Sequence, residues 1–204
     1  AHEYLRQEVR HFVHENQLDK QAEHYDQEEC LNTELFQRLA EQGWLGVTIP
    51  EEYGGMGMDT TAAVIIHHEL SKSDPGFCLA YLAHAMLFVN NFFHCSSEEQ
   101  KARFLEPVLT GEWVAGMAMT EPGYGTDVLG MTTTAVKHGD HYVLNGTKTY
   151  ITNGPEGHIF LVYAKVNGRI TSFVVTRDCQ GFSSSHHIPK MGMRASSMSE
   201  LIFE

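Results

Sequence analysis

The chain has 204 residues, of which 42% are hydrophobic and 20% charged, a composition typical of a globular protein with a sizeable core. Its net charge of −12 argues against general nucleic-acid binding, because an acidic surface repels the phosphate backbone. No apolar run approaches the roughly 18 residues that a membrane-spanning helix needs, so we expect no membrane partner. The four cysteines form no CxxC pair and the 13 histidines show no ligand spacing, so we expect a reducing compartment and no metal site.

The first half of the chain is predicted to be a bundle of helices. It contains most of the acid, since residues 1–112 hold 7 Lys and Arg against 19 Asp and Glu. Asn32 is a predicted N-cap, Gly43 a predicted helix stop, and Ser97–Gln100 a predicted capping box. Apolar residues recur at helical spacing over residues 5–13, 31–39, 60–72, 77–94 and 98–109.

The second half, from about Trp113, has the period of two that is typical of strands. Residues 141–152 are predicted to be two strands joined by Asn145-Gly146, because Asn-Gly is the strongest short hairpin signal. Helices followed by strands, without alternation, indicate an α+β fold. We expect a helical bundle over residues 1–112 and an antiparallel β-barrel or sandwich domain over residues 113–204. Further strands are expected over residues 132–137, 159–165, 170–175 and 200–204.

A glycine-rich segment, residues 116–128, lies between the two halves. Gly123 and Gly125 permit positive φ and a close backbone approach. Successive N–H groups beside the Thr126 hydroxyl can form an anion-binding nest, although the same spacing also occurs in ordinary turns. A Rossmann phosphate loop is disfavoured, because the segment has no third glycine, following helix or βαβ context.

Three stretches of the chain carry its most specific motifs: Ala118-Met-Thr-Glu-Pro-Gly-Tyr-Gly-Thr-Asp127, Asn145-Gly-Thr-Lys-Thr-Tyr-Ile-Thr-Asn-Gly154 and Lys190-Met-Gly-Met-Arg-Ala-Ser196. Together with shorter motifs they resemble the acyl-CoA dehydrogenase family, over nearly the whole chain. In the first half, Gly43–Gly46 and Pro50–Gly55 occur where that family has similar motifs. Thr152–Pro155 and Leu161–Lys165 look most like the isovaleryl-CoA branch. The resemblance implies the helical N-terminal and β-rich middle domains of the family, without its C-terminal helical domain.

The resemblance implies that the glycine-rich segment binds FAD. Met117, Met119 and Thr120 match residues whose backbone and hydroxyl groups contact the flavin ring. Gly125 and Thr126 match contacts to the FAD diphosphate, and Thr126 also matches a position near the substrate.

Two residues of the strand region complete the implied site. Tyr150 matches an aromatic side chain packed near the isoalloxazine, and Thr152 matches the hydroxyl that bonds flavin N5. In a regular strand these two side chains share one face. Glu121 and Asp127 are interpreted as residues that organise the loop, and neither is assigned a catalytic role.

The reaction implied by the resemblance is α,β-dehydrogenation of an acyl-CoA thioester, with hydride transfer to N5 of FAD. The implied partners are an acyl-CoA substrate and an electron-transfer flavoprotein, in a homotetramer located in the bacterial cytoplasm or the mitochondrial matrix. The family's catalytic glutamate is expected beyond Glu204, so no catalytic base is assigned and the chain alone is expected to be inactive. Alternatives are a flavin-dependent acyl-CoA or nitroalkane oxidase of the same superfamily, and a non-catalytic DNA-binding or scaffold relative.

Overall fold

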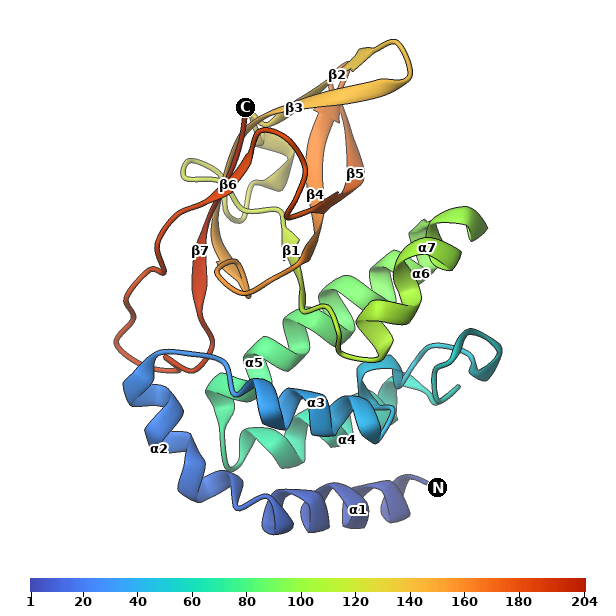
Figure 1. The fold of residues 1–204 in the computed structure, drawn as a ribbon, viewed down its shortest axis with the longest axis vertical. Coiled ribbons are helices and arrows are strands. Elements are labelled where there is room, and N and C mark those ends of the chain that lie inside the picture. Colours follow the sequence, from blue (N-terminus) through green and yellow to red (C-terminus); the bar gives the residue numbers. More distant parts are fainter.

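Helices form the lower part of the molecule in Figure 1, a computed structural model that describes all residues 1–204. The predicted helical first half is confirmed. The helices are α1 His2–Glu15, α2 Leu18–Glu28, α3 Thr33–Glu41, α4 Thr60–Ser71, α5 Pro75–Leu82, the π-helical stretch η3 Ala83–Asn90, α6 Asn91–Cys95 and α7 Glu98–Leu109.

Local sequence signals set several helix ends. The Asn32 side chain accepts the N–H of Leu35 at 2.9 Å, which confirms the predicted cap of α3. Both hydrogen bonds of the predicted capping box at Ser97 are present at the start of α7. Helix α2 was not predicted, because Leu18 is its only buried residue and its sequence therefore lacks an apolar stripe.

The helical stretch Pro75–Cys95 corrects one expectation from the sequence. The sequence is expected to contain no apolar stretch long enough to cross a membrane, but by length and composition alone this 21-residue helix could do so. Of its most apolar window, 61% is buried inside the fold, as in a helix of a protein core. Its interior position explains why it is apolar on nearly all sides.

The strands form one curled seven-stranded sheet above the helices (Figure 1). The strand order is β1-β4-β2-β3-β7-β6, and β5 pairs with β4 outside this path. The sheet is largely antiparallel, but β1 and β2 each pair parallel to β4. The strands are β1 Ala115–Ala118, β2 Thr134–His138, β3 His141–Thr152, β4 Ile159–Val166, β5 Arg169–Thr176, β6 Phe182–Ser184 and β7 Met198–Phe203.

The predicted hairpin at Asn145-Gly146 is wrong. These residues lie inside the continuous strand β3, and the hairpin that exists turns at Gly139–Asp140, between β2 and β3. At Gly146 the strand changes partner from β2 to β7. A Cβ on Gly146 would lie 2.5 Å from the Thr133 hydroxyl oxygen, so close packing explains this glycine better than a turn does.

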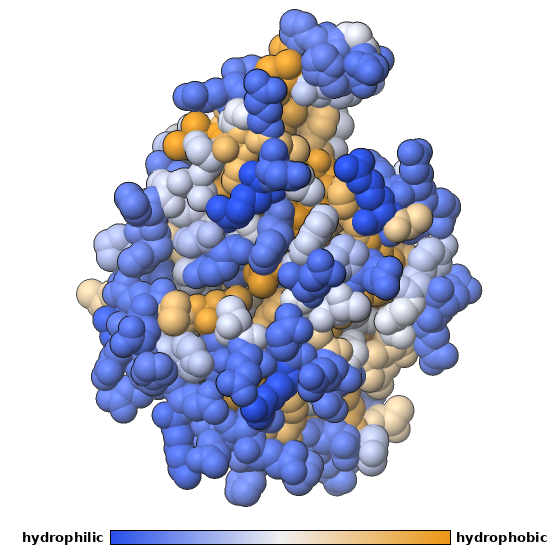
Figure 2. Space-filling view, viewed as in Figure 1, coloured by the Kyte–Doolittle hydropathy of each residue, from blue (hydrophilic) through white to orange (hydrophobic).

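The buried apolar side chains form three clusters. The largest lies among the helices, and the smallest lies within the sheet. The third joins the parts, because Phe88 of η3 and Val108 of α7 pack with Ala115 of β1 and Ile159 of β4. Figure 2 shows hydrophilic side chains over most of the helical part, with apolar residues exposed towards the centre of this face.

Candidate functional site

The glycine-rich segment forms a loop between β1 and β2. The backbones of Glu121 and Tyr124 exchange two hydrogen bonds of 3.0 Å, which closes a tight turn in the loop. The Asp127 carboxylate accepts the N–H of Gly130 at 3.2 Å. The loop is therefore an ordered substructure with its own internal hydrogen bonds.

A buried ion pair attaches this loop to β3. Glu121 is 3% exposed and Lys148 0% exposed, and the Lys148 Nζ donates to Glu121 Oε1 at 2.9 Å. Glu121 Oε2 accepts the N–H and the hydroxyl of Thr132 at 2.6 and 2.7 Å, and Oε1 accepts the N–H of Thr133 at 2.9 Å. These contacts agree with the interpretation of Glu121 as a residue that organises the loop.

Acid is expected to weaken this attachment. Burial alone would raise the pKa of Glu121, but hydrogen bonds from Thr133, Thr132 and Lys148 outweigh burial and lower the pKa from 4.5 to about 2. Because the folded pKa is the lower one, the stabilisation is complete above pH 4.5 and is lost as the pH falls towards 2. We expect the double variant Glu121→Gln/Lys148→Met, which leaves no buried charge without a partner, to flatten the pH dependence of the unfolding free energy in this range, measured by urea unfolding.

Glu41→Gln is the matched control for this measurement, since Glu41 is exposed at the end of α3 and no side-chain hydrogen bond holds it. Its pH profile should follow that of the parent chain. An equally steep profile for Glu121→Gln/Lys148→Met would contradict the assignment.

The outer part of the loop has space in front of it. A Cβ added to Gly123 or Gly125 would meet no atom within 4 Å, so this chain leaves room for a ligand to approach the backbone. The N–H groups of Gly125 and Thr126 form no hydrogen bond within the chain. Neither glycine adopts the positive φ that it permits, and the Glu121–Tyr124 hydrogen bonds close the turn.

The strand residues of the predicted site lie at a β-bulge in β3. The pairing of β3 with β7 shifts between Lys148 and Ile151, and Tyr150 adopts a φ of +56° and is 62% exposed. The bulge interrupts the alternation before Tyr150, since Lys148 and Thr149 are buried in succession. From Tyr150 onwards the pattern alternates, with Tyr150 exposed, Ile151 buried and Thr152 half-buried. Left-handed backbone in a residue other than glycine is strained and is concentrated at functional sites.

The fold brings most of the predicted site residues together. The N–H of Thr149 donates to the carbonyl of Thr120 at 2.9 Å, so Met119 and Thr120 lie beside the bulge that carries Tyr150. A Cβ on Gly116, next to Met117, would lie 2.7 Å from the carbonyl oxygen of Thr152. Met117, Met119, Thr120, Tyr150 and Thr152 therefore occupy adjacent segments, whereas Gly125 and Thr126 lie farther out on the exposed loop.

Three side chains that support this region were not predicted: Asn153 and His84, which are buried, and Arg177, which is half-buried. Asn153 donates to the carbonyls of Ala80 and Ala115 at 3.0 and 2.9 Å, and so ties the end of β3 to α5 and β1. The Arg177 guanidinium donates to backbone carbonyls of the turn that follows β3. His84 of η3 contacts the backbones of α7 and β1. Of the three, only Asn153 lies in one of the motifs that resemble the family.

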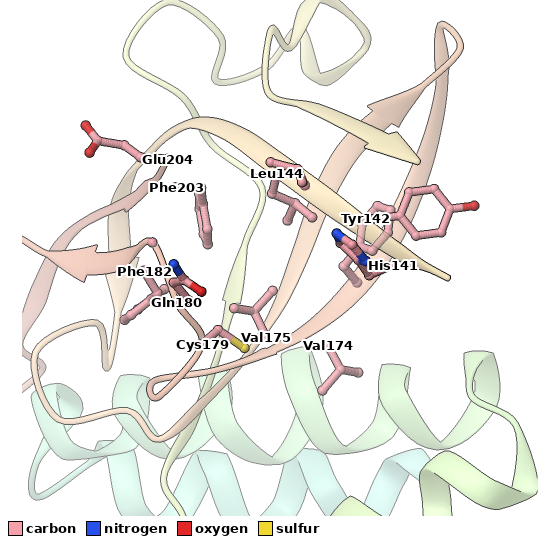
Figure 3. A pocket seen from close by; sticks show the side chains of 13 residues that line it. His141, Tyr142, Leu144, Val174, Val175, Cys179, Gln180, Phe182, Phe203 and Glu204 are labelled. Atoms are coloured by element: carbon pink, nitrogen blue, oxygen red, sulfur yellow. The ribbon is translucent and has the colours of Figure 1, made fainter. Parts of the chain in front are cut away.

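A separate pocket lies in the sheet between β3, β5, β6 and β7 (Figure 3). It encloses about 560 Å³, and Leu144, Val175, Phe182 and Phe203 are among its lining side chains. None of the predicted site residues lines it. A second cavity, of about 580 Å³, lies on the helical part between α4 and α5.

Comparisons with known proteins identify the family. Residues 1–112 match the acyl-CoA dehydrogenase N-terminal domain, and residues 116–204 match the acyl-CoA dehydrogenase middle domain. The chain belongs to the acyl-CoA dehydrogenase family. The resemblance drawn from the sequence motifs is thus confirmed, as is the order of a helical domain followed by a curled β-domain.

Individual relatives agree with this assignment. The mitochondrial isovaleryl-CoA dehydrogenase of Pongo abelii is 38% identical over 98% of this chain and 49% of its own length. An acyl-CoA dehydrogenase from Bacillus anthracis complexed with FAD is 36% identical, with a TM-score of 0.91 over 100% of this chain and 35% of its own. A chain from the structure described as the electron transferring flavoprotein of Acidaminococcus fermentans is 34% identical, with a TM-score of 0.94 over 100% and 55%. The chain spans about half the length of the curated relatives that it matches.

Proposed function

We propose that this chain forms the helical and the flavin-binding domains of an FAD-dependent acyl-CoA dehydrogenase, over residues 1–112 and 113–204. The observation that carries the proposal is the contact between the glycine-rich loop and the β3 bulge, which brings Met119 and Thr120 beside Tyr150. The loop matches the family's FAD motif in sequence, and it also has room at Gly125 for the cofactor to approach.

The proposed cofactor site uses two segments of the chain. Met117, Met119 and Thr120 would contact the flavin ring from the end of β1, with Tyr150 and Thr152 beside them on β3. FAD supplies the hydride acceptor when it is bound. The protein's part is to hold the ring and the substrate in a fixed relation and to exclude water.

The outer loop is proposed to bind the diphosphate of FAD. The free N–H groups of Gly125 and Thr126, together with the Thr126 hydroxyl, form an uncharged donor set that suits a phosphate. Thr126 would also lie near the substrate.

The acyl chain is proposed to follow the helical cavity between α4 and α5. Leu82 and Met86 line this cavity together with Cys78, and its wall is mostly apolar, which suits an acyl group and disfavours an ionic substrate. An electron-transfer flavoprotein is the proposed electron acceptor, and a homotetramer in the bacterial cytoplasm or the mitochondrial matrix is the proposed assembly.

An oxidase of the same superfamily is the second candidate function, because it would share the same FAD motifs. Reactivity of the reduced protein with oxygen distinguishes the two. A DNA-binding relative is disfavoured by the net charge of −12.

The decisive test of the loop is Gly125→Val, in the protein that carries this chain at its natural length. We expect loss of FAD from the purified protein, because the valine side chain would occupy the space into which the diphosphate fits. Thr126→Ala should weaken FAD binding only about 2- to 10-fold, since it removes one hydroxyl hydrogen bond. Both are measured as FAD content and by fluorescence titration.

Gly192→Val is the matched control, because a Cβ on Gly192 also meets no atom within 4 Å and its φ is not positive. This variant should retain FAD. Full FAD occupancy in the Gly125→Val protein would refute the placement of the diphosphate.

A further inference from the structure

Lys148 has an unusual position for a lysine. Its side chain is 0% exposed, and its Nζ donates both to the Met119 carbonyl at 3.0 Å and to Glu121 Oε1 at 2.9 Å. It lies on β3 directly before the bulge that carries Tyr150. One ammonium group thus contacts the end of β1, the loop and the strand that together form the proposed flavin site.

The ion pair is an inefficient way to stabilise a fold. Removing two charges from water costs as much as their attraction returns, and apolar residues of similar volume often do as well. Apolar partners surround the position, since Leu201 lies opposite Lys148 in β7 and Ile151 follows in the same core. The pair is therefore better explained by the backbone groups that it orients than by stability alone.

The oriented groups are the peptides of Met119 and Thr120. Lys148 fixes the Met119 carbonyl, and the N–H of Thr149 fixes the Thr120 carbonyl at 2.9 Å. The N–H of Thr120 belongs to the same peptide group as the Met119 carbonyl and points in the opposite direction. It forms no hydrogen bond within the chain, so it is available to a ligand in a fixed direction. A preorganised donor of this kind binds a ligand without a cost of reorganisation at the moment of binding.

We propose that Lys148 and Glu121 are positioning residues for the flavin, acting through the Met119 and Thr120 peptides. This inference rests on the proposed function. Glu121 holds Lys148 in place and fastens the far end of the loop at Thr132 and Thr133, so that the flavin-contacting peptides and the diphosphate loop are set by one buried pair.

The test uses the double variant Glu121→Gln/Lys148→Met in the protein of natural length. The single variant Lys148→Met leaves a buried charge without a partner and is not suitable alone, whereas the double variant leaves none. We expect the melting temperature of the double variant to stay within a few degrees of the parent, with FAD binding about tenfold weaker, the equivalent of one to two hydrogen bonds. The visible absorption band and the reduction potential of the bound flavin should also shift.

Two further variants separate positioning from simple folding. Lys148→Arg keeps a buried cation that donates hydrogen bonds, and we expect it to recover most of the FAD affinity and the parent spectrum. Lys137→Met, on the exposed part of β2, is the matched control and should leave both unchanged.

An affinity within twofold of the parent, with an unchanged flavin spectrum, would overturn the positioning role while leaving the proposed function intact. A parent protein that takes up no FAD at all would overturn the proposed function itself, and the positioning role with it. The two failures are therefore distinguishable by the behaviour of the parent alone.

Discussion

Replacing His84 by alanine is expected to lower the free energy of unfolding by about 3–5 kcal/mol. His84 is completely buried where η3 meets α7 and β1. Its Nδ1 accepts the N–H of Ala115 at 3.0 Å, and its Nε2 lies 2.9 Å from the Val108 carbonyl. Because an amide only donates and a carbonyl only accepts, the ring must be neutral with its proton on Nε2. Alanine leaves a cavity and two backbone groups without partners.

The loss is measured by urea unfolding of the 204-residue chain, with His94→Ala as the matched control. His94 is exposed on α6 of the same long helix, so its truncation should change the unfolding free energy by less than about 0.5 kcal/mol. A loss below about 1 kcal/mol for His84→Ala would show that the two backbone groups find other partners.

His84 is also expected to make the free energy of unfolding depend on pH. Burial lowers the pKa of His84 from 6.5 to about 4. Protonation is also disfavoured because it would turn Nδ1 into a donor that faces the Ala115 N–H. A lowered folded pKa means that the contribution is complete above pH 6.5 and is lost as the pH falls towards 4. The His84→Ala chain should lack this part of the pH profile.

Complete absence of acyl-CoA turnover is the result expected for residues 1–204 expressed alone. Removing an α-proton needs a base within hydrogen-bond reach of the substrate carbon. Glu121 is the buried carboxylate of the loop, and its oxygens are already occupied by Lys148, Thr132 and Thr133. Its pKa of about 2 makes it a poor base.

Anaerobic bleaching of added FAD by butyryl-, isovaleryl- and octanoyl-CoA measures this result. A full-length acyl-CoA dehydrogenase of the same family, assayed in parallel, is the positive control. Bleaching by the 204-residue chain would show that a competent base lies within it, and the chemistry would have to be reassigned to these residues.

Features set by short-range contacts could be predicted from the sequence. The Asn32 cap and the Ser97 capping box depend only on residues three positions away, and both were predicted correctly. The motifs of the loop and of β3 also identified the family.

Features set by distant partners could not be predicted. Asn145-Gly146 carries a strong turn signal, but Thr133 packs against Gly146 and holds it inside a strand. His84 contacts groups 24 and 31 residues away, and no spacing in the sequence marks them as neighbours. The positive φ of the site lies at Tyr150 and not at the loop glycines, because the bulge depends on how β7 pairs with β3.

The contacts along β3 limit where residues can be inserted into this protein. Between Gly146 and Asn153 the strand is fixed at both ends, by Thr133 packed against Gly146 and by the contacts of Asn153 with α5 and β1. A single inserted residue would move every later side chain to the opposite face and take Tyr150 away from the loop. Insertions should be tolerated instead at the exposed turns Gly139–Asp140 and Asn167–Gly168, because a Cβ on Gly139 or Gly168 would meet no atom within 4 Å.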